Sequence, residues 1–216
     1  MHAQTAETAQ WWARSRGETN TEWVTRYQQS LQAPHRAVIL RAVQSVPKVT
    51  TVLEVGCHCG PNLVKLAQAM PQLEMLSGVD VNPEAIAGGQ RWVTSLGLSA
   101  RIELASGDLL TRMSALPDAC ADVVLSCYTL AYIAPEDLDA VLYEMGRLAK
   151  RAVILAEPMG PTTEQVRGGF SGYSEWAHGY QTALKWIGTL RECAATVIPV
   201  EPPVDRLNGV LVVTRK

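Results

Sequence analysis

Two glycines, Gly56 and Gly60, lie between an apolar segment and a pattern typical of a helix start. The segment from Thr50 to Val55 is β-branched and apolar, which predicts a buried strand, and Pro61 suits the first turn of a helix. Glycines allow the backbone to approach a ligand closely, and a helix N-terminus offers free N–H groups with a partial positive charge. This stretch therefore predicts a site for an anion or a nucleotide.

An acidic residue stands at the end of the next predicted strand. The segment from Leu73 to Val81 is mostly apolar and contains Asp80 near its end. Dinucleotide-type folds place a carboxylate roughly twenty residues after the glycine turn, where it accepts hydrogen bonds from ribose hydroxyls. The glycine loop and Asp80 together predict a nucleoside pocket.

These motifs resemble those of the class I S-adenosylmethionine-dependent methyltransferases, whose first motif is Glu/Asp-x-Gly-x-Gly-x-Gly and whose second strand ends in an acidic residue. The matching positions are Glu54, Gly56, Gly60 and Asp80. His58 replaces the middle glycine, and histidine is among the residues that tolerate a positive φ. The resemblance implies S-adenosylmethionine as cofactor and S-adenosylhomocysteine as product. It also implies that the loop backbone holds the methionine part, that Asp80 binds the ribose and that Glu54 orders the loop.

A third acidic residue, Asp108, follows the predicted strand from Arg101 to Ala105. In the resembled family an acidic residue here binds the adenine amino group and a neighbouring apolar side chain packs on the ring, which implies these roles for Asp108 and Leu109. An aspartate after a glycine is also a common turn residue, so that alternative stays open. The other expected cofactor contacts lie beside the same motifs and after the fourth strand, and are Cys57, Asn62, Val81 and Ser126.

A polar and aromatic segment follows the predicted fourth strand. Family members that methylate exocyclic amines of nucleic-acid bases usually carry an Asp/Asn-Pro-Pro-aromatic run here, and Ser126-Cys127-Tyr128-Thr129 lacks it. We therefore expect a small-molecule acceptor. Tyr128 and Tyr132 are expected beside that acceptor, although either ring can simply cap the sheet.

Three side chains are candidates for catalysis at the acceptor: Tyr128, Glu157 and His178. Glu157 follows the predicted strand from Ala152 to Ala156 and precedes a glycine-rich loop, which we expect to cover the acceptor site. His178 lies in a stretch, 171–190, whose apolar residues suggest a helix face. A neutral imidazole can accept a proton from the acceptor, but a lone histidine is more often packed or exposed.

The end of the chain indicates how the sheet is completed. Cys193 to Val200 and Val210 to Thr214 are both strand-like, and the residues between them are too few for a crossover helix. They should form an antiparallel hairpin, and the resembled family likewise reverses its last strand. We expect an α/β fold with a doubly wound, Rossmann-like seven-stranded sheet, an antiparallel last strand and an N-terminal helical cap. The 216 residues should form a single domain, with the cap in 1–48 and the core in 49–216.

The N-terminal segment, 6–46, predicts helices rather than strands. Its aromatic residues are Trp11, Trp12, Trp23 and Tyr27. These rings either pack against the domain or form a lid over the cofactor, as segments before the first strand often do in the resembled family.

The composition of the chain limits the classes of binding partner that we expect. Hydrophobic residues make up 47% of the chain, and 19 basic residues are scattered among 21 acidic ones, so we expect no nucleic-acid partner. No apolar run is long enough for a membrane span, so we expect no membrane association. The five cysteines lack Cys-x-x-Cys spacing, which predicts reduced thiols in a cytoplasmic protein and no bound metal.

Two other functions remain open from the sequence. A nicotinamide-dependent oxidoreductase would use parallel strands joined by helices, and no Tyr-x-x-x-Lys pair is present. A non-catalytic module that binds S-adenosylmethionine would carry the same cofactor motifs without transferring a methyl group. The methyl acceptor and the oligomeric state are not predicted by any motif.

Overall fold

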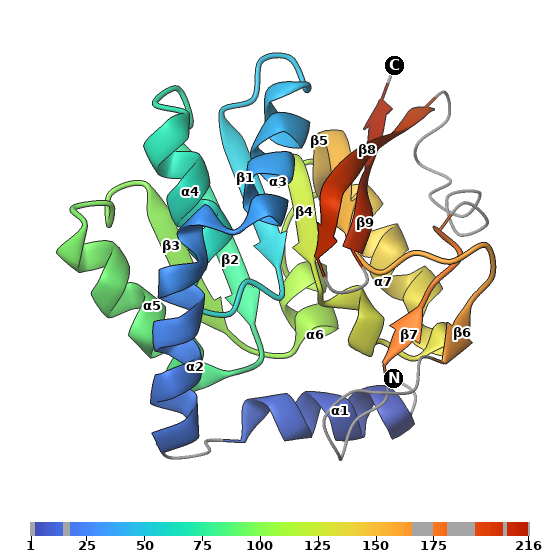
Figure 1. Cartoon of the computed structure of the whole chain (residues 1–216), viewed down its shortest axis with the longest axis horizontal. Helices are drawn as coiled ribbons and strands as arrows, with labels where there is room; N and C mark the ends of the chain where they lie inside the picture. Colours follow the sequence, from blue (N-terminus) through green and yellow to red (C-terminus); the bar gives the residue numbers. More distant parts are fainter. Residues whose placement is uncertain (1–2, 15–17, 166–174, 181–192, 205–206, 216) are drawn as a thin grey trace.

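The fold centres on a mixed seven-stranded sheet, seen in a computed structural model that describes residues 3–14, 18–165, 175–180, 193–204 and 207–215 (Figure 1). The strand order is β3-β2-β1-β4-β5-β9-β8. The strands are β1 (Thr51–Val55), β2 (Met75–Asp80), β3 (Ile102–Ser106), β4 (Ala121–Cys127), β5 (Ala149–Ala156), β8 (Cys193–Val204) and β9 (Leu207–Arg215). The predicted doubly wound sheet is therefore confirmed.

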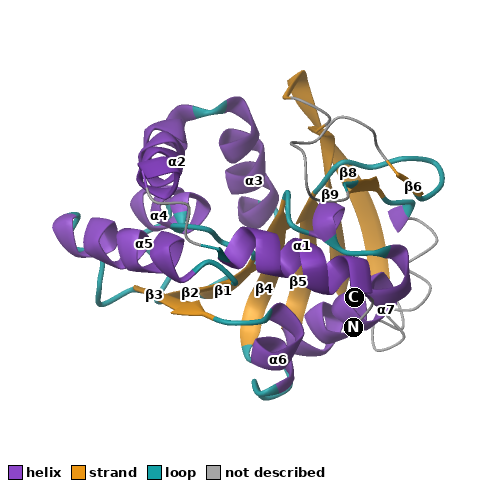
Figure 2. Cartoon of the chain, turned by 90° about the horizontal axis from the view of Figure 1, so that it is seen from below, coloured by secondary structure: helices purple, strands orange, loops and turns teal. Residues whose placement is uncertain are grey.

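The first five strands are parallel, and each pair is joined by a crossover helix. Proline stands in the first turn of three of these helices, where its missing N–H costs nothing. The crossover helices are α4 (Pro61–Ala69), α5 (Pro83–Ser95), α6 (Leu109–Ser114) and α7 (Pro135–Leu148). Figure 2 shows α4 and α5 on one face of the sheet and α6 and α7 on the other.

Each face of the sheet has its own apolar core. Val64 and Ile86 belong to the core beneath α4 and α5, whereas Met113 and Leu142 belong to the core beneath α6 and α7. The central strand β1 is buried over its last four residues, as a strand covered on both faces should be. The carboxyl ends of all five parallel strands therefore meet at one edge of the sheet.

The last two strands form the predicted hairpin. β9 runs antiparallel to β5, with Ala152 opposite Thr214, and β8 runs antiparallel to β9. The strands are longer than the sequence pattern indicated, since β8 continues past Val200 and β9 begins at Leu207. This reversed edge excludes the all-parallel sheet of a nicotinamide-binding Rossmann domain.

The N-terminal segment is helical, as expected. It forms α1 (Ala3–Ala13), α2 (Glu18–Gln29), a 3-10 turn η1 (Ser30–Gln32) and α3 (Pro34–Gln44). α3 packs on the sheet through buried residues that include Ile39 and Ala42. Figure 1 shows α1 lying across the carboxyl ends of the strands, with α2 beside α5.

The segment after β5 differs from the prediction. The stretch 171–190 was expected to present a helix face, but within it β7 (Trp176–Ala177) pairs antiparallel with β6 (Glu164–Gln165). Tertiary pairing here outweighs the helical spacing of the apolar residues. Residues 171–174 and 181–190 of that stretch, and residues 166–172 of the predicted glycine-rich lid, lie outside the described residues. Among the described helices, none has the length and apolar character needed to cross a membrane.

Candidate functional site

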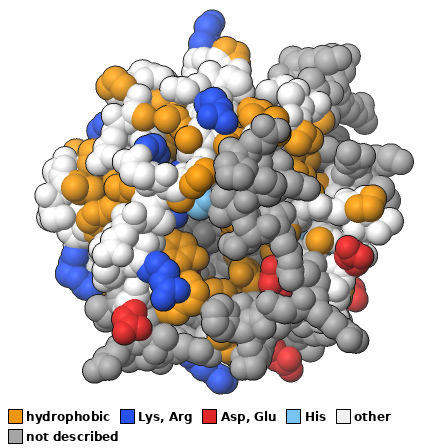
Figure 3. All heavy atoms as spheres, in the orientation of Figure 1, with side chains coloured by type: hydrophobic (Ala, Val, Ile, Leu, Met, Phe, Trp, Pro, Cys, Tyr) orange, Lys and Arg blue, Asp and Glu red, His pale blue; other side chains and the backbone are white. Residues whose placement is uncertain are grey.

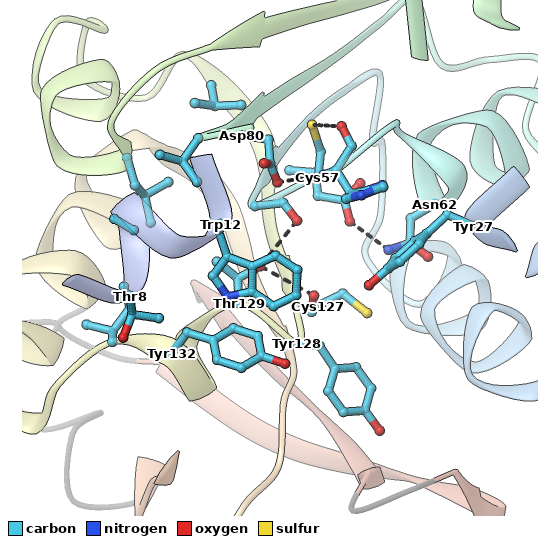
Figure 4. Close-up of a pocket in the computed structure, with 18 of the residues that line it drawn as sticks. Thr8, Trp12, Tyr27, Cys57, Asn62, Asp80, Cys127, Tyr128, Thr129 and Tyr132 are labelled. Atoms are coloured by element: carbon cyan, nitrogen blue, oxygen red, sulfur yellow. Dashed lines mark hydrogen bonds between the residues drawn. The ribbon is translucent and has the colours of Figure 1, made fainter. Parts of the chain in front are cut away.

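A cavity lies at the carboxyl ends of the parallel strands, under α1 and α2 (Figure 4). Its volume of about 800 Å³ falls in the range of about 300–1,000 Å³ typical of small-molecule sites. Two sets of residues line it. The glycine-loop wall consists of Glu54, Gly56, Cys57, His58, Asn62, Asp80, Val81, Asp108 and Leu109, and the aromatic wall consists of Trp12, His35, Tyr128 and Tyr132.

The glycine loop, residues 56–60, is tied to the neighbouring strand. The N–H groups of Gly56 and Cys57 both donate to the Val79 carbonyl, at 2.8 and 3.0 Å. Gly56 has a φ of +73°, and a Cβ at this position would overlap the Thr129 side chain. The Thr129 hydroxyl in turn donates to the Gly56 carbonyl at 3.2 Å. Position 56 therefore requires glycine for both its conformation and its close packing.

Asp80 ends β2 with its carboxylate fixed by two backbone donors. The His58 N–H donates to Oδ2 at 2.7 Å, and the Asn82 N–H donates to Oδ1 at 2.8 Å. Burial raises the pKa of Asp80 above its ordinary value, and the backbone donors oppose that shift. Because each carboxylate oxygen can accept a second hydrogen bond, both oxygens can still bind a diol in the cavity.

Glu54 is the end of a buried hydrogen-bonded chain. The Arg36 guanidinium donates to Asn62 Oδ1, and Asn62 Nδ2 donates to Glu54 Oε1 at 2.6 Å. The other oxygen, Glu54 Oε2, is buried with no hydrogen-bond partner in the described part of the chain. Burial raises the pKa of Glu54 to about 8, although Asn62 and Arg36 act in the opposite direction. A cationic group in the cavity would find an acceptor in Oε2.

Asp108 has a local structural partner as well as a place at the cavity. It is the N-cap of α6, where Oδ1 accepts from the Thr111 N–H at 2.9 Å and from the Thr111 hydroxyl at 2.8 Å. Leu109 and Val81 line the cavity beside it. The structure thus supports the turn-residue alternative for Asp108 and also includes Asp108 in the cavity lining.

His58, the residue in place of the middle glycine, occupies the loop with a φ of +50°. Its ring stacks on Tyr27 of α2, with ring centroids 4.1 Å apart. Burial, with a smaller effect of Arg36, lowers the pKa of His58 to about 4, so the imidazole is neutral at physiological pH. The substitution therefore connects the glycine loop to the N-terminal helices.

Helix α1 contributes Trp12 to the aromatic wall. Trp12 lies 5.2 Å from Tyr132 and 6.4 Å from Trp23, measured between ring centroids. The helix is held in place by a buried hydrogen bond, in which the Ala134 N–H donates to the Thr5 hydroxyl at 2.9 Å. α1 therefore covers the cavity and contributes to its lining.

Tyr128 and His35 meet where the aromatic wall approaches the sheet. Tyr128 follows β4 with a φ of +53°, an uncommon conformation for a bulky residue, and its N–H donates to the Ala156 carbonyl at 3.1 Å. The His35 ring stands edge-on to the Tyr128 ring, at a centroid distance of 6.4 Å. Both side chains line the cavity.

Glu157 does not lie where the sequence suggested a base. It is fully buried and absent from the cavity lining. Its Oε1 accepts from the Ser126 hydroxyl at 2.6 Å and from the Thr129 N–H at 3.0 Å, while Oε2 accepts from the Ala131 N–H at 3.3 Å. Burial raises the pKa of Glu157 to about 7, against the effect of these donors. Glu157 and Ser126 are therefore joined to each other, and Glu157 also holds the segment after β4.

His178 is likewise buried and is not among the residues that line the cavity. Its Nε2 lies 3.0 Å from the Leu130 carbonyl and 3.1 Å from the Ile133 carbonyl, so this nitrogen carries the proton and donates to both. Burial lowers the pKa of His178 below its ordinary value. The geometry gives His178 a structural role at the turn η2 (Leu130–Tyr132) and argues against the expected role as base.

Most of the predicted site residues are brought together by the fold. Those that line the cavity are Glu54, Gly56, Cys57, Asn62, Asp80, Val81, Asp108, Leu109 and Tyr128. Those that do not are Gly60, the N-cap residue of α4, together with Ser126, Glu157 and His178. The residues added by the structure include His35 and Arg36, for which the sequence offered only the prediction of helices over 6–46.

Comparison with known proteins adds independent information. A family model described as a methyltransferase domain matches residues 52–152 of the chain. The catechol O-methyltransferase of Mus musculus is 29% identical over 123 residues, which cover 55% of this chain and 46% of that protein. The rRNA N(6)-adenosine-methyltransferase metl-5 of Caenorhabditis elegans is 34% identical over 74 residues, which cover 34% of each chain. The chain spans about half the length of the first relative and about a third of the second.

Solved structures show the same architecture. Magnesium protoporphyrin IX methyltransferase (ChlM) from Synechocystis PCC 6803, solved with bound SAM, has a TM-score of 0.68 at 16% sequence identity. The similarity covers 100% of this chain and 99% of that one. At this level of identity the comparison shows a common fold.

Proposed function

We propose that this protein is an S-adenosylmethionine-dependent methyltransferase that acts on a small-molecule acceptor, because a methyltransferase-domain model matches residues 52–152 and the sheet has the class I fold. The observation that carries the proposal is the Asp80 carboxylate. Both of its oxygens are oriented by backbone N–H groups, and it lies on the cavity beside a glycine loop that is itself bonded to β2. This is the arrangement that binds the ribose of a nucleoside.

The residues of the glycine-loop wall fit the proposed cofactor. The unpartnered Oε2 of Glu54 suits the ammonium group of a methionine moiety, and Asp80 suits the two ribose hydroxyls. Asp108 and Leu109 stand where the adenine would lie. The cavity, at about 800 Å³, has room for a nucleoside cofactor together with a small second molecule.

The chemistry expected of this site requires little from the protein beyond alignment. When bound, the cofactor supplies a methyl group on a sulfonium, which is already activated for in-line displacement. The glycine-loop wall would hold and orient that group, and α1 would exclude water by covering the cavity. Of the three expected catalytic residues, Tyr128 alone lines the cavity in the described structure, so it is retained as an acceptor contact.

A small acceptor fits the site better than a nucleic acid. Helix α1 covers the cavity, and Trp12 and Tyr132 lie against each other within it, so an extended polymer has little access. On the face drawn in Figure 3, the described Lys and Arg side chains are scattered rather than gathered into one patch. The four described cysteines, Cys57, Cys59, Cys120 and Cys127, are free thiols, which supports a reducing compartment such as the cytoplasm.

Calorimetric titration of the purified protein with S-adenosylmethionine, S-adenosylhomocysteine and NAD tests the cofactor. We expect saturable binding of the two sulfur nucleosides and none of NAD. Asp80→Ala should weaken their affinity by about 5–150-fold, because one charge-assisted hydrogen-bonding group, worth about 1–3 kcal/mol, is removed. Unchanged affinity in Asp80→Ala would remove the ribose assignment, and binding of NAD alone would favour an oxidoreductase.

Transfer of a labelled methyl group distinguishes an enzyme from a binding module. The protein is incubated with labelled S-adenosylmethionine and a small-molecule cell extract, and the products are separated by chromatography. A labelled product that is absent with Asp80→Ala supports the methyltransferase. Cofactor binding without transfer to any extract component would instead support the non-catalytic module.

A further inference from the structure

His35 occupies the boundary between the two walls of the cavity. It is adjacent to Arg36, whose guanidinium donates to Asn62 on the glycine-loop wall and to the Ser30 carbonyl at 2.9 Å. His35 itself stands edge-on to Tyr128, at a centroid distance of 6.4 Å. The first turn of α3 is therefore anchored by Arg36 on one side and presents His35 to the segment after β4 on the other.

The Nδ1 atom of His35 is buried and has no hydrogen-bond partner among the described residues. A buried polar atom without a partner is costly unless a ligand or water supplies one, and this residue lines the cavity. The Nδ1 atom of His178 is also buried without a partner among the described residues, but His178 is not among the residues that line the cavity, and its Nε2 donates to the Leu130 and Ile133 carbonyls. Glu157 is committed to Ser126 and to the backbone after β4. His58 also has an unpartnered Nδ1, but its ring is stacked on Tyr27 within the glycine loop.

We propose that His35 is the base that accepts the proton of the methyl acceptor, and that this acceptor is a hydroxyl group on a flat aromatic ring. This inference rests on the proposed methyltransferase function. The geometry that carries it is an imidazole with an unpartnered ring nitrogen, on a residue that lines the cavity and stands edge-on to Tyr128. The rings of Trp12, Tyr128 and Tyr132 offer flat apolar surfaces on which an aromatic acceptor can pack.

The transfer balances without any further reactant. A lone pair of the acceptor oxygen forms a bond to the methyl carbon, while the carbon–sulfur bond of the methyl donor breaks and its electron pair remains on sulfur. The hydroxyl proton moves to the neutral imidazole of His35, which becomes an imidazolium and later releases the proton to water. Because the O–H group becomes strongly acidic as the O–C bond forms, a weak base suffices.

The environment of His35 keeps it ready for this role. Burial and the neighbouring Arg36 lower the pKa of His35 to about 4, so the ring is neutral and can accept a proton at physiological pH. A neutral amine acceptor would need no base for the methyl transfer itself. A hydroxyl acceptor is therefore the class that makes use of this imidazole.

The test uses 4-nitrocatechol as the acceptor probe, with wild type, His35→Ala, His35→Gln and a control, Arg41→Gln, on the exposed side of the same helix. Calorimetry measures the binding of S-adenosylhomocysteine, and of the probe to protein saturated with S-adenosylhomocysteine. Turnover is measured with S-adenosylmethionine. We expect both His35 variants to lower kcat by about 10²–10⁴-fold, with both binding constants within about threefold of wild type. Added imidazole should restore part of the turnover of His35→Ala, and Arg41→Gln should match wild type.

Other results would overturn the inference. A kcat of His35→Gln near that of wild type, or a rate of His35→Ala that imidazole does not raise, would remove His35 as the base. Wild-type protein that binds S-adenosylhomocysteine but neither binds nor methylates 4-nitrocatechol would exclude the aromatic hydroxyl class. Absence of S-adenosylhomocysteine binding in wild type would instead contradict the proposed function itself.

Discussion

The two walls of the cavity are built in different ways. The glycine-loop wall depends on backbone: amides of residues 56, 57, 58 and 82 fix the loop and Asp80, and Gly56 packs directly against Thr129. The aromatic wall depends on side chains from α1 and from the segment after β4, with α1 attached through the Thr5 hydroxyl. A wall made of backbone leaves little room for substitution, whereas a wall made of rings can vary and so set the choice of acceptor.

Gly56→Ala should have the largest effect on cofactor affinity. A Cβ would overlap Thr129 and strain a φ of +73°, so the loop must move. We expect cofactor affinity to fall by at least about 100-fold and stability by about 1–3 kcal/mol. Calorimetric titration and urea unfolding measure the two quantities.

Gly97→Ala is the matched control for that change. Gly97 has a φ of +69°, but a Cβ there would meet nothing within 4 Å. Gly97→Ala should lower the free energy of unfolding by only about 1 kcal/mol, the cost of a left-handed backbone conformation, and should leave cofactor affinity unchanged. Equal losses of affinity in the two variants would mean that the close contact with Thr129 is not what shapes the loop.

Glu54→Gln should have a smaller effect on cofactor affinity, and this effect should depend on pH. The pKa of Glu54 is raised to about 8, and a bound ammonium group favours the ionised form. Cofactor binding to wild type should therefore release a proton below pH 8, and affinity should rise toward pH 8 by up to about tenfold per pH unit. Glu54→Gln should lose this dependence. Titrations between pH 6 and pH 8.5 measure the slope.

Stability should show the opposite trend in the absence of cofactor. Because the folded-state pKa of Glu54 lies above its ordinary value of 4.5, the folded protein binds the extra proton between pH 4.5 and pH 8. The contribution of this proton to the free energy of unfolding is present at low pH and is lost as the pH rises through 8. The other titrating groups, including Asp80, are the same in wild type and in Glu54→Gln, so the difference between the two pH profiles of unfolding reports on Glu54. Parallel pH profiles of unfolding for wild type and Glu54→Gln would therefore rule out the assignment.

The smallest effect on the cofactor should come from Thr5→Val, which acts on the aromatic wall. The change leaves the buried N–H of Ala134 without its acceptor, at a cost of about 1–3 kcal/mol to the docking of α1. We expect faster amide exchange in α1 and at Ala134, with cofactor affinity within about threefold of wild type. A loss of cofactor affinity comparable to that of Gly56→Ala would show that the two walls are not separable.

Local patterns predicted the parts of the fold that rest on neighbouring residues. The strand, glycine loop and helix start around Gly56 depend on turn conformation and on the missing amide hydrogen of Pro61, which are properties of a few consecutive residues. The hairpin at the end of the chain followed from a short connection, and the sheet confirms it. The helix predicted across 171–190 was wrong for β7, because strand pairing with β6 outweighed helical spacing.

The polar residues considered for the site likewise include some that the sequence could place and some that only the tertiary structure places. From sequence alone, Asp80 could be placed because it ends a strand next to β1 in a parallel sheet, where the position after the strand leads to the carboxyl edge. Glu157 directly follows strand β5, yet it does not line the cavity, because Ser126 of β4 and two backbone donors from the segment after β4 surround its carboxylate. Only the tertiary structure decided that His35 and Arg36 face the cavity and that His178 does not. Those outcomes depend on packing between α3, η2 and the sheet, whose residues lie far apart in the chain and carry no common local pattern.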